Sequence, residues 1–249
     1  MELVIAVLAG LLAGHVLDLA FARFYKEESL GGPLYRCREC RKPLRPLYAV
    51  PLLGYALSGG RCRDCGVPLP VTAVILPIGG AMLFAASEIA FGNLAGGLLG
   101  GLFGTIFLTL TMTDIERRLL PNRLVYPSIL LAIALSWAWP DSSVQNVLLG
   151  GLVAAAIGVL LILLSLPFGR GAFGMGDVKM IVLIGFVVGL PSILVGIFVG
   201  TLAAACAAFV LIATRVRKRT DYIPHGPFLA LGAVVALFWG AAIWHAYTG

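Results

Sequence analysis

Apolar stretches of membrane-spanning length recur along the whole chain. A helix that crosses a bilayer needs about 20 mostly apolar residues, and a single such stretch near the N-terminus could be a signal peptide. Repeated stretches cannot all be signal peptides, and we expect the first one to remain in the mature protein. The eight stretches are residues 3–21, 70–90, 94–113, 124–139, 144–166, 178–190, 192–213 and 227–247. The sequence therefore predicts an all-α polytopic membrane protein with about eight transmembrane helices.

Composition supports a lipid rather than an aqueous environment. Only 12% of the residues are charged and 60% are hydrophobic, with a mean hydropathy of +0.99, whereas a soluble domain is about 25% charged. The net charge of +6 would favour a nucleic-acid partner only if the basic residues clustered on a soluble surface. They lie between the apolar stretches instead, so we expect the lipid bilayer and no nucleic acid as a partner.

The distribution of basic residues predicts the orientation of the helices. Lys and Arg favour cytosolic loops, so they should occur in every second connection. Nine lie in residues 22–69 and three in 114–123, and the rest are Arg170, Lys179, Arg215, Arg217, Lys218 and Arg219. With eight spans all eighteen fall on one side, and both termini face away from the cytosol. Merging the sixth and seventh spans would break this alternation and place Pro191 inside one overlong helix.

The connection between the first two spans carries two related cysteine pairs. Cys37-Arg38-Glu39-Cys40 and Cys62-Arg63-Asp64-Cys65 each precede a proline and a leucine, and 21 residues separate the pairs. This spacing is typical of a four-cysteine zinc site, here a cytosolic zinc ribbon whose folding would depend on the metal. Disulfides or redox pairs are the alternative, although a cytosolic location disfavours stable disulfides. Cys206 stands alone in an apolar stretch and is expected only to pack.

Two aspartates stand where apolar stretches meet the predicted cytosolic face. An ionisable group near the membrane centre costs about 2.5 to 3.5 kcal/mol on insertion scales, so each is a candidate functional residue. Asp114 follows the third span and Asp177 precedes the sixth. Aspartic proteolysis needs two nearby carboxylates, one ionised and one protonated. From the chemistry alone, interfacial carboxylates paired with Arg117, Arg118 and Lys179 are an equally open interpretation.

The motifs around these aspartates resemble a known family. Gly174-x-Gly176-Asp177-x-Lys179, with Asp114 upstream before Leu120-Pro121, is similar to the GxGD aspartic peptidases, specifically the type IV prepilin peptidases. The resemblance covers nearly the whole chain. Its other parts are Gly14-His15-Val16-Leu17-Asp18 with Arg23, the two cysteine pairs with Pro51-Leu52-Leu53-Gly54-Tyr55 between them, and Ile223-Pro224-His225-Gly226-Pro227-Phe228-Leu229-Ala230-Leu231-Gly232.

The resemblance implies an enzyme that cleaves leader peptides of type IV prepilins and pseudopilins at the cytosolic face of the bacterial inner membrane. It makes Asp114 and Asp177 the catalytic pair and Cys37, Cys40, Cys62 and Cys65 the zinc ligands. Supporting motif residues are Gly174, Gly176, Lys179, Pro121, Pro224, Gly226 and Pro227. The expected domains are a first transmembrane helix (1–21), the zinc-ribbon loop (22–69, a region associated with methyl transfer) and a seven-helix peptidase domain (70–249).

Members with the cysteine loop also methylate the new N-terminus with S-adenosylmethionine, so the resemblance implies that second reaction and cofactor. No glycine-rich nucleotide fingerprint supports it here. His15 stands where the family usually has serine, Asp18 where it usually has asparagine, and residues 71–79 lack the usual glutamate. His15 and Asp18 have helical i, i+3 spacing and are expected to form a local polar pair. A dedicated peptidase without methyltransferase activity is therefore the alternative.

Two other classes of protein fit parts of the sequence. A cation-coupled transporter could use Asp114 and Asp177 as ligands, although transporter sites lie near the midplane and often within inverted repeats. A membrane thiol oxidoreductase could use the cysteine pairs but leaves both aspartates unexplained. His225, which replaces the usual phenylalanine of the last motif, is expected near the active site, and His245 carries no signal.

Overall fold

The computed structural model describes most of the chain. It covers residues 1–24, 37, 39–40, 42, 50–139, 143–168, 174–216, 218 and 224–249, with only the backbone described at 21–24 and 168. The Arg23 side chain and several residues named above, namely Arg38, Arg170, Arg217, Arg219 and Ile223, lie outside the described residues.

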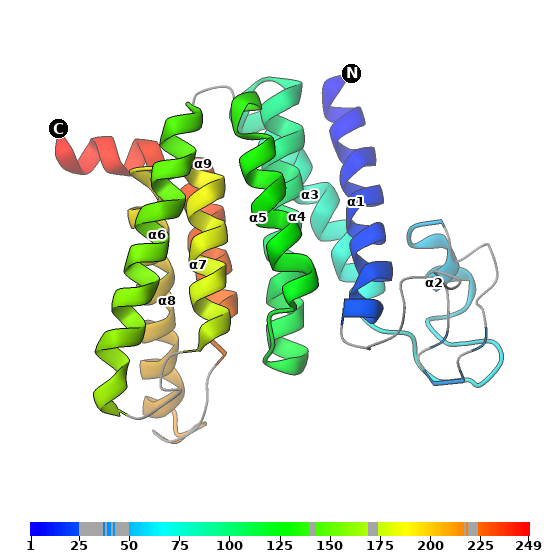
Figure 1. Cartoon of the computed structure of the whole chain (residues 1–249). Coiled ribbons are helices and arrows are strands. Elements are labelled where there is room, and N and C mark those ends of the chain that lie inside the picture. The colour runs from blue at the N-terminus through cyan, green and yellow to red at the C-terminus, as the bar shows by residue number, and fades with distance from the viewer. Residues whose placement is uncertain are drawn as a thin grey trace. The chain divides into compact units, whose positions relative to one another are not determined.

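Each of the eight predicted spans corresponds to a helix, which confirms the all-α fold (Figure 1). The helices are α1 (Glu2–Phe24), α2 (Leu53–Leu57), α3 (Thr72–Phe91), α4 (Leu94–Arg117), α5 (Asn122–Ala134), α6 (Val144–Ser165), α7 (Met175–Val188), α8 (Ser192–Ala213) and α9 (Gly226–Thr248). Six of them, all but α2, α5 and α7, are long and apolar enough to cross a membrane. The short α2 lies in the cysteine loop and was not predicted.

The ends of the helices place the two aspartates inside regular structure. The apolar stretch 94–113 predicted that Asp114 ends the third span, but α4 continues through Arg117. The Arg118 N–H donates to the Asp114 carbonyl at 2.8 Å, so the last turn closes beyond the apolar stretch. The predicted separation of the sixth and seventh spans is confirmed, because α7 ends at Val188, Gly189 adopts a φ of 65° that favours glycine, and α8 begins at Ser192.

The chain divides into two compact units, Met1–Thr109 and Leu110–Gly249. In the first unit α1 packs against α3, and a Cβ on Gly10 would overlap the Gly80 carbonyl. Small residues at such contacts let two membrane helices approach closely. Close packing is what holds helices together in lipid, because lipid offers no hydrophobic force between them. His15 and Asp18 of α1 are both buried in this unit.

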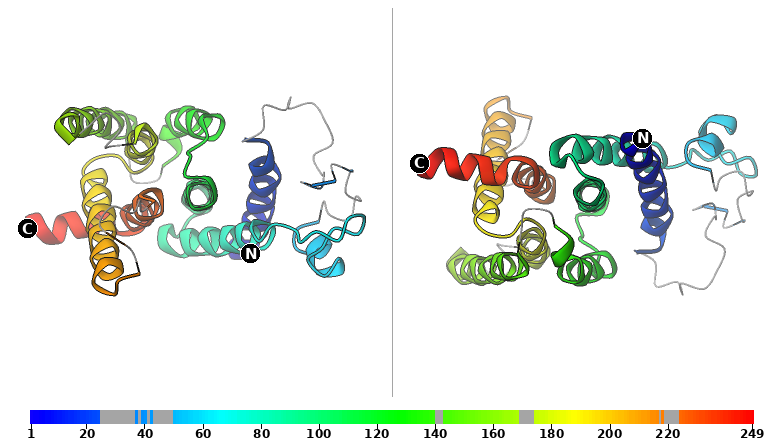
Figure 2. Two further views of the ribbon diagram at one scale, coloured as in Figure 1. Left: turned by 90° about the horizontal axis from the view of Figure 1, so that it is seen from below. Right: turned by 90° about the horizontal axis from the view of Figure 1, so that it is seen from above.

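The second unit is built from pairs of helices that lie side by side, α6 with α7 and α8 with α9, while α5 and α9 also contact α7 (Figure 2). At the α8–α9 contact, a Cβ on Gly200 would lie 2.9 Å from the Phe228 carbonyl oxygen. The glycines therefore set the helix spacing. This packing brings the end of α4 and the starts of α7 and α9 together.

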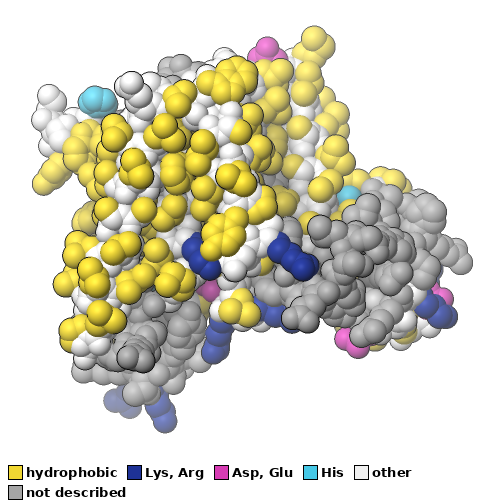
Figure 3. All heavy atoms as spheres, in the orientation of Figure 1, with side chains coloured by type: hydrophobic (Ala, Val, Ile, Leu, Met, Phe, Trp, Pro, Cys, Tyr) yellow, Lys and Arg dark blue, Asp and Glu magenta, His cyan; other side chains and the backbone are white. Residues whose placement is uncertain are grey.

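The outside of the helices is apolar. Leu130, Leu164 and Phe209 are 60% or more exposed, and Figure 3 shows hydrophobic side chains over much of the visible face, with Lys and Arg toward the lower ends of the helices. In contrast, Thr105 and Thr109 are fully buried within α4, where their hydroxyls donate to backbone carbonyls four residues earlier. Apolar surface outside and satisfied polar groups inside are what a lipid solvent requires. The chain is a multi-pass membrane protein.

Candidate functional site

Asp114 lies in the last turn of α4 and is 4% exposed. Its Oδ2 accepts a hydrogen bond of 3.0 Å from the backbone N–H of Gly226, and Gly226 is the first residue of α9. The first N–H groups of a helix have no partner within the helix, and the positive end of the helix dipole attracts an anion. The N-terminus of α9 is therefore a fixed donor for this carboxylate, across 112 residues of sequence.

The fit between Asp114 and Gly226 leaves no room for a side chain. A Cβ on Gly226 would lie 2.6 Å from Oδ2 and 2.9 Å from Cγ of Asp114. The last motif thus contributes a backbone N–H and a space, both from Gly226. Pro227 occupies the first turn of α9, where its fixed φ favours helix initiation and its missing N–H is not needed.

His225 is the residue immediately before α9 and lies within electrostatic range of Asp114. Burial lowers the pKa of its imidazole, and the negative charge of Asp114 acts in the opposite direction. The His225 carbonyl accepts the N–H groups of Phe228 and Leu229, both at 3.1 Å, so the imidazole is attached to an ordered helix start. Pro224 precedes it and is half-buried.

Asp177 is the third residue of α7 and is half-buried. Its backbone N–H donates to the Gly174 carbonyl at 3.0 Å, and a Cβ on Gly174 would lie 3.0 Å from Asp177 Oδ2. The glycine before α7 therefore gives the carboxylate room over its own helix start. The position of Gly176 faces Leu120, whose side chain would be 3.4 Å from an added Cβ.

The two carboxylates come from different helices but interact electrostatically with each other. Asp114 also lies within range of the positive charge of Arg118. The turn that contains Arg118 ends at Pro121, which is buried and whose carbonyl accepts the Leu124 and Val125 N–H groups at 3.0 Å as α5 begins. Two acidic side chains, one held by a backbone donor and one beside small residues, can act together on a carbonyl and a water.

Lys179 makes contacts that the sequence did not predict. Its Nζ donates to Asn122 Oδ1 at 2.8 Å and lies 5.4 Å from the centre of the Tyr126 ring. Both partners belong to the first turns of α5. The sequence offered no signal for this interaction, because a hydrogen bond between residues 57 positions apart depends on how α5 and α7 pack.

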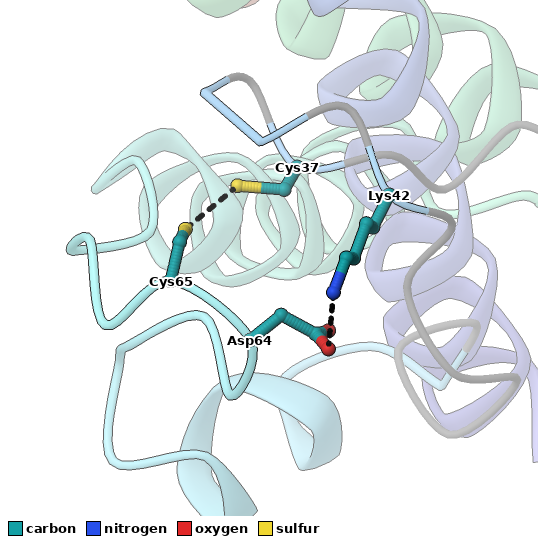
Figure 4. A network of polar contacts seen from close by, with 4 residues as sticks. All are labelled: Cys37, Lys42, Asp64 and Cys65. Carbon is teal, nitrogen blue, oxygen red and sulfur yellow. Dashed lines mark hydrogen bonds and ion pairs between the residues drawn. The ribbon is translucent and has the colours of Figure 1, made fainter.

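The four cysteines form a cluster in the loop that connects α1 to α3 in the first unit. Their sulfurs all lie within 4.8 Å of one another, and Cys37 Sγ is 3.6 Å from Cys65 Sγ (Figure 4). Four sulfurs bound to one zinc at ~2.3 Å in a tetrahedron would lie about 3.8 Å apart. All four are free thiols rather than disulfides. The residues therefore fit a metal ion of the zinc type.

The two related cysteine pairs of the sequence form the same backbone turn twice. The Cys37 N–H donates to the Lys42 carbonyl at 3.0 Å, and the Cys62 N–H donates to the Val67 carbonyl at 2.8 Å, five residues ahead in both cases. The two turns also meet through an ion pair of 3.5 Å between Lys42 and Asp64 (Figure 4). This ion pair is exposed and adds little stability, so the turns need another link.

Backbone donors lower the pKa of one cysteine and so favour its thiolate form. The N–H groups of Cys65 and Asp64 lower the pKa of Cys62 to about 7. The pKa of Cys65 rises to about 12, because loss of solvent and the hydrogen bonds of the other sulfurs outweigh the lowering effect of the Val67 N–H. Four adjacent thiols without a cation cannot all ionise, whereas a bound divalent cation stabilises the thiolates.

Comparison with known proteins gives one consistent result. Residues 101–212 match the type IV leader peptidase family, and residues 8–91 match the bacterial peptidase A24 N-terminal domain. The chain is 28% identical to a prepilin leader peptidase/N-methyltransferase of Bacillus subtilis, over 94% of this chain and 93% of that protein. It is 28% identical to one of Aeromonas hydrophila (83% and 72%) and 25% identical to one of Pseudomonas aeruginosa (86% and 74%).

No solved structure matches the chain at a significant level. The two matched regions together contain the cysteine cluster, Asp114, Asp177 and Lys179, whereas Pro224, Gly226 and Pro227 of the last motif lie beyond them. The relatives also match over most of their own length. The chain belongs to the type IV leader peptidase family.

Proposed function

We propose that this protein is a membrane-embedded aspartic endopeptidase that removes leader peptides from type IV prepilins and pseudopilins at the cytosolic membrane face. The observation that carries the proposal is the pair of carboxylates in the second unit. Asp114 is buried and held by the Gly226 N–H, and Asp177 interacts electrostatically with it from the start of α7. The relatives named above supply the substrate class.

The chemistry follows that of other paired carboxylic acids. One ionised carboxylate takes a proton from water as the oxygen attacks the scissile carbonyl, while the protonated partner hydrogen-bonds to the carbonyl oxygen and stabilises the developing charge. The proton then passes to the leaving amine as the peptide bond breaks. Because Gly226 fixes one oxygen of Asp114, that carboxylate cannot rotate freely and its other oxygen keeps one orientation. Fixed geometry of this kind lowers the entropic part of the barrier.

The position of the site agrees with a cytosolic reaction. Arg117 and Lys179 flank the two aspartates on α4 and α7, and basic residues mark the cytosolic side of membrane proteins. We therefore place the site at the cytosolic face of the bacterial inner membrane and both termini on the opposite face. Residues 70–249 would form the peptidase domain, after the first helix (1–21).

The cysteine cluster and a second reaction belong to the same proposal. Cys37, Cys40, Cys62 and Cys65 would hold one structural zinc that joins the two turns of residues 22–69, since this polar loop has little apolar core. We further propose that the new N-terminus is methylated with S-adenosylmethionine. The names of the relatives support this step, whereas His15 and Asp18 on α1 depart from the usual family residues.

The test uses the full-length protein in lipid nanodiscs with a synthetic prepilin-like peptide. Asp114→Asn and Asp177→Asn should each lower kcat by about 100-fold to 10,000-fold, because each amide removes a proton carrier. Glu116→Gln, an exposed carboxylate in the same turn of α4 as Asp114, is the matched control and should cleave at the wild-type rate. Mass spectrometry of the product with and without S-adenosylmethionine then reports methylation.

Each outcome separates the alternatives. Cleavage that survives in either Asp→Asn variant, with the protein correctly inserted, rules out the aspartic mechanism. Absence of cleavage in the wild type, together with cation-dependent uptake that Asp114→Asn abolishes, would support a transporter instead. A cleaved product whose mass does not change with S-adenosylmethionine makes the protein a dedicated peptidase.

A further inference from the structure

Lys179 links the start of α7 to the start of α5. Its ammonium donates to the Asn122 amide oxygen at 2.8 Å and faces the Tyr126 ring at 5.4 Å. We call these three residues the α5–α7 bridge. All three lie within the first turns of their helices, at the end of the second unit where Asp177 stands.

The first turn of α7 offers little side-chain surface for packing. Met175 is 58% exposed, and positions 174 and 176 are glycines without side chains to pack. The buried residues of the helix begin at Val178, one position after Asp177. Helix ends fray when little holds them, and the bridge is a polar contact close to this turn that ties α7 to another helix.

The bridge is suited to setting a position rather than to adding stability. Asn122 and Tyr126 are exposed, and Lys179 is half-buried. Exposed charged contacts contribute little to the free energy of unfolding. However, α5 follows α4 by only the short turn that ends at Pro121, so a link from α5 to α7 connects the elements that carry Asp114 and Asp177.

We propose that Lys179 is a positioning residue of the peptidase, which acts through the α5–α7 bridge to hold the first turn of α7 and the Asp177 carboxyl in the catalytic geometry. The proposal rests on the peptidase function proposed above. It assigns Lys179 no contact with the substrate. Loss of the bridge should therefore lower kcat and leave KM for the peptide unchanged.

Three single substitutions and one double variant test the bridge in the nanodisc assay. Lys179→Leu should lower kcat about tenfold to 100-fold, since small displacements of a catalytic group have effects of this size. Asn122→Ala should act in the same direction, and the double variant should be no worse than Lys179→Leu alone, because both changes break one interaction. Lys179→Arg should restore most of the rate, since a guanidinium can donate to Asn122 and stack on Tyr126. Arg215→Leu removes the same charge from the end of α8 and is the control.

A second readout does not depend on activity. The methyl resonance of Met175, in the first turn of α7, should shift and broaden in Lys179→Leu and keep its wild-type form in Lys179→Arg and Arg215→Leu. The positioning role is contradicted by wild-type kcat in Lys179→Leu, by additive losses in the double variant, or by an unchanged Met175 signal. Failure of the peptidase function is recognised separately, because it appears as cleavage that persists in Asp114→Asn or Asp177→Asn.

Discussion

Gly226 and Asp114 depend on each other at the scale of single residues. The glycine gives the carboxylate a donor at 3.0 Å and the space that its oxygen occupies. Any larger residue except proline would keep the N–H but remove the space. The need for glycine here is steric, since Gly226 lies in a regular helix and needs no unusual backbone angles.

Gly226→Ala should therefore reduce cleavage by about 100-fold, because the new Cβ displaces the Asp114 carboxylate from its hydrogen bond. The matched control is Gly240→Ala in the same helix, whose Cβ would also lie 2.6 Å from its nearest atom, in this case Cβ of Ser192. Both variants should lose about 1 to 3 kcal/mol of stability through overpacking, which thermal unfolding measures. Equal activity in the two variants would show that the Asp114 contact has no catalytic importance.

At the scale of structural elements, the two cysteine turns share one backbone geometry and meet at their sulfurs. The same backbone hydrogen bond closes each turn, and the cysteines of both turns converge within 4.8 Å. Among the described residues of the loop, an exposed ion pair and the sulfur cluster join the turns to each other. We therefore expect the loop to depend on a metal ion bound by the sulfurs.

Metal analysis of the purified protein should find about one zinc per chain. Replacing Cys37 and Cys62 together by serine should remove it and make the loop sensitive to protease, because metal binding supplies the folding energy of such loops. Cys206→Ser, in the apolar helix α8, should leave the metal content unchanged. A metal-free protein with disulfides in this loop would refute the zinc assignment.

At the scale of the whole molecule, the positions of the basic residues predict the orientation of the helices. The eighteen Lys and Arg residues fall in alternate connections of an eight-span chain, and the structure has a helix for each span. The helices α5 and α7 have 13 and 14 residues, shorter than the ~20 that a full crossing needs. The predicted orientation, with every basic residue on one side, nevertheless has both of them cross.

Reporter fusions in cells test this orientation. Alkaline phosphatase, which is active only outside the cytosol, should be active when joined after Gly249, since the C-terminus is predicted on the non-cytosolic face. A fusion after Lys218, in the basic connection between α8 and α9, should be inactive. The reverse pattern would invert the whole topology and place Asp114 and Asp177 at the wrong face.

The sequence by itself determined the helices and the candidate residues. Apolar length predicts a membrane helix because the bilayer thickness and the rise per residue are both constant, and eight stretches gave eight helices. The cysteine spacing predicted the cluster because neighbouring residues set the turn. Local rules missed the continuation of α4 beyond Asp114 and the short α2, since neither is marked by an apolar stretch of its own.

Tertiary structure alone decided how those residues meet. Glu88 lies two residues from the end of its predicted span, yet it is 7% exposed, because helix packing and not hydropathy sets its surroundings. The Gly226–Asp114 and Lys179–Asn122 hydrogen bonds join residues 112 and 57 positions apart. No local pattern encodes such contacts, since they depend on the spacing and rotation of packed helices. The sequence motifs identified Asp114 and Asp177 as candidate residues. The fold determines the Gly226 N–H and the space beside Asp114, and the Lys179–Asn122 contact near Asp177.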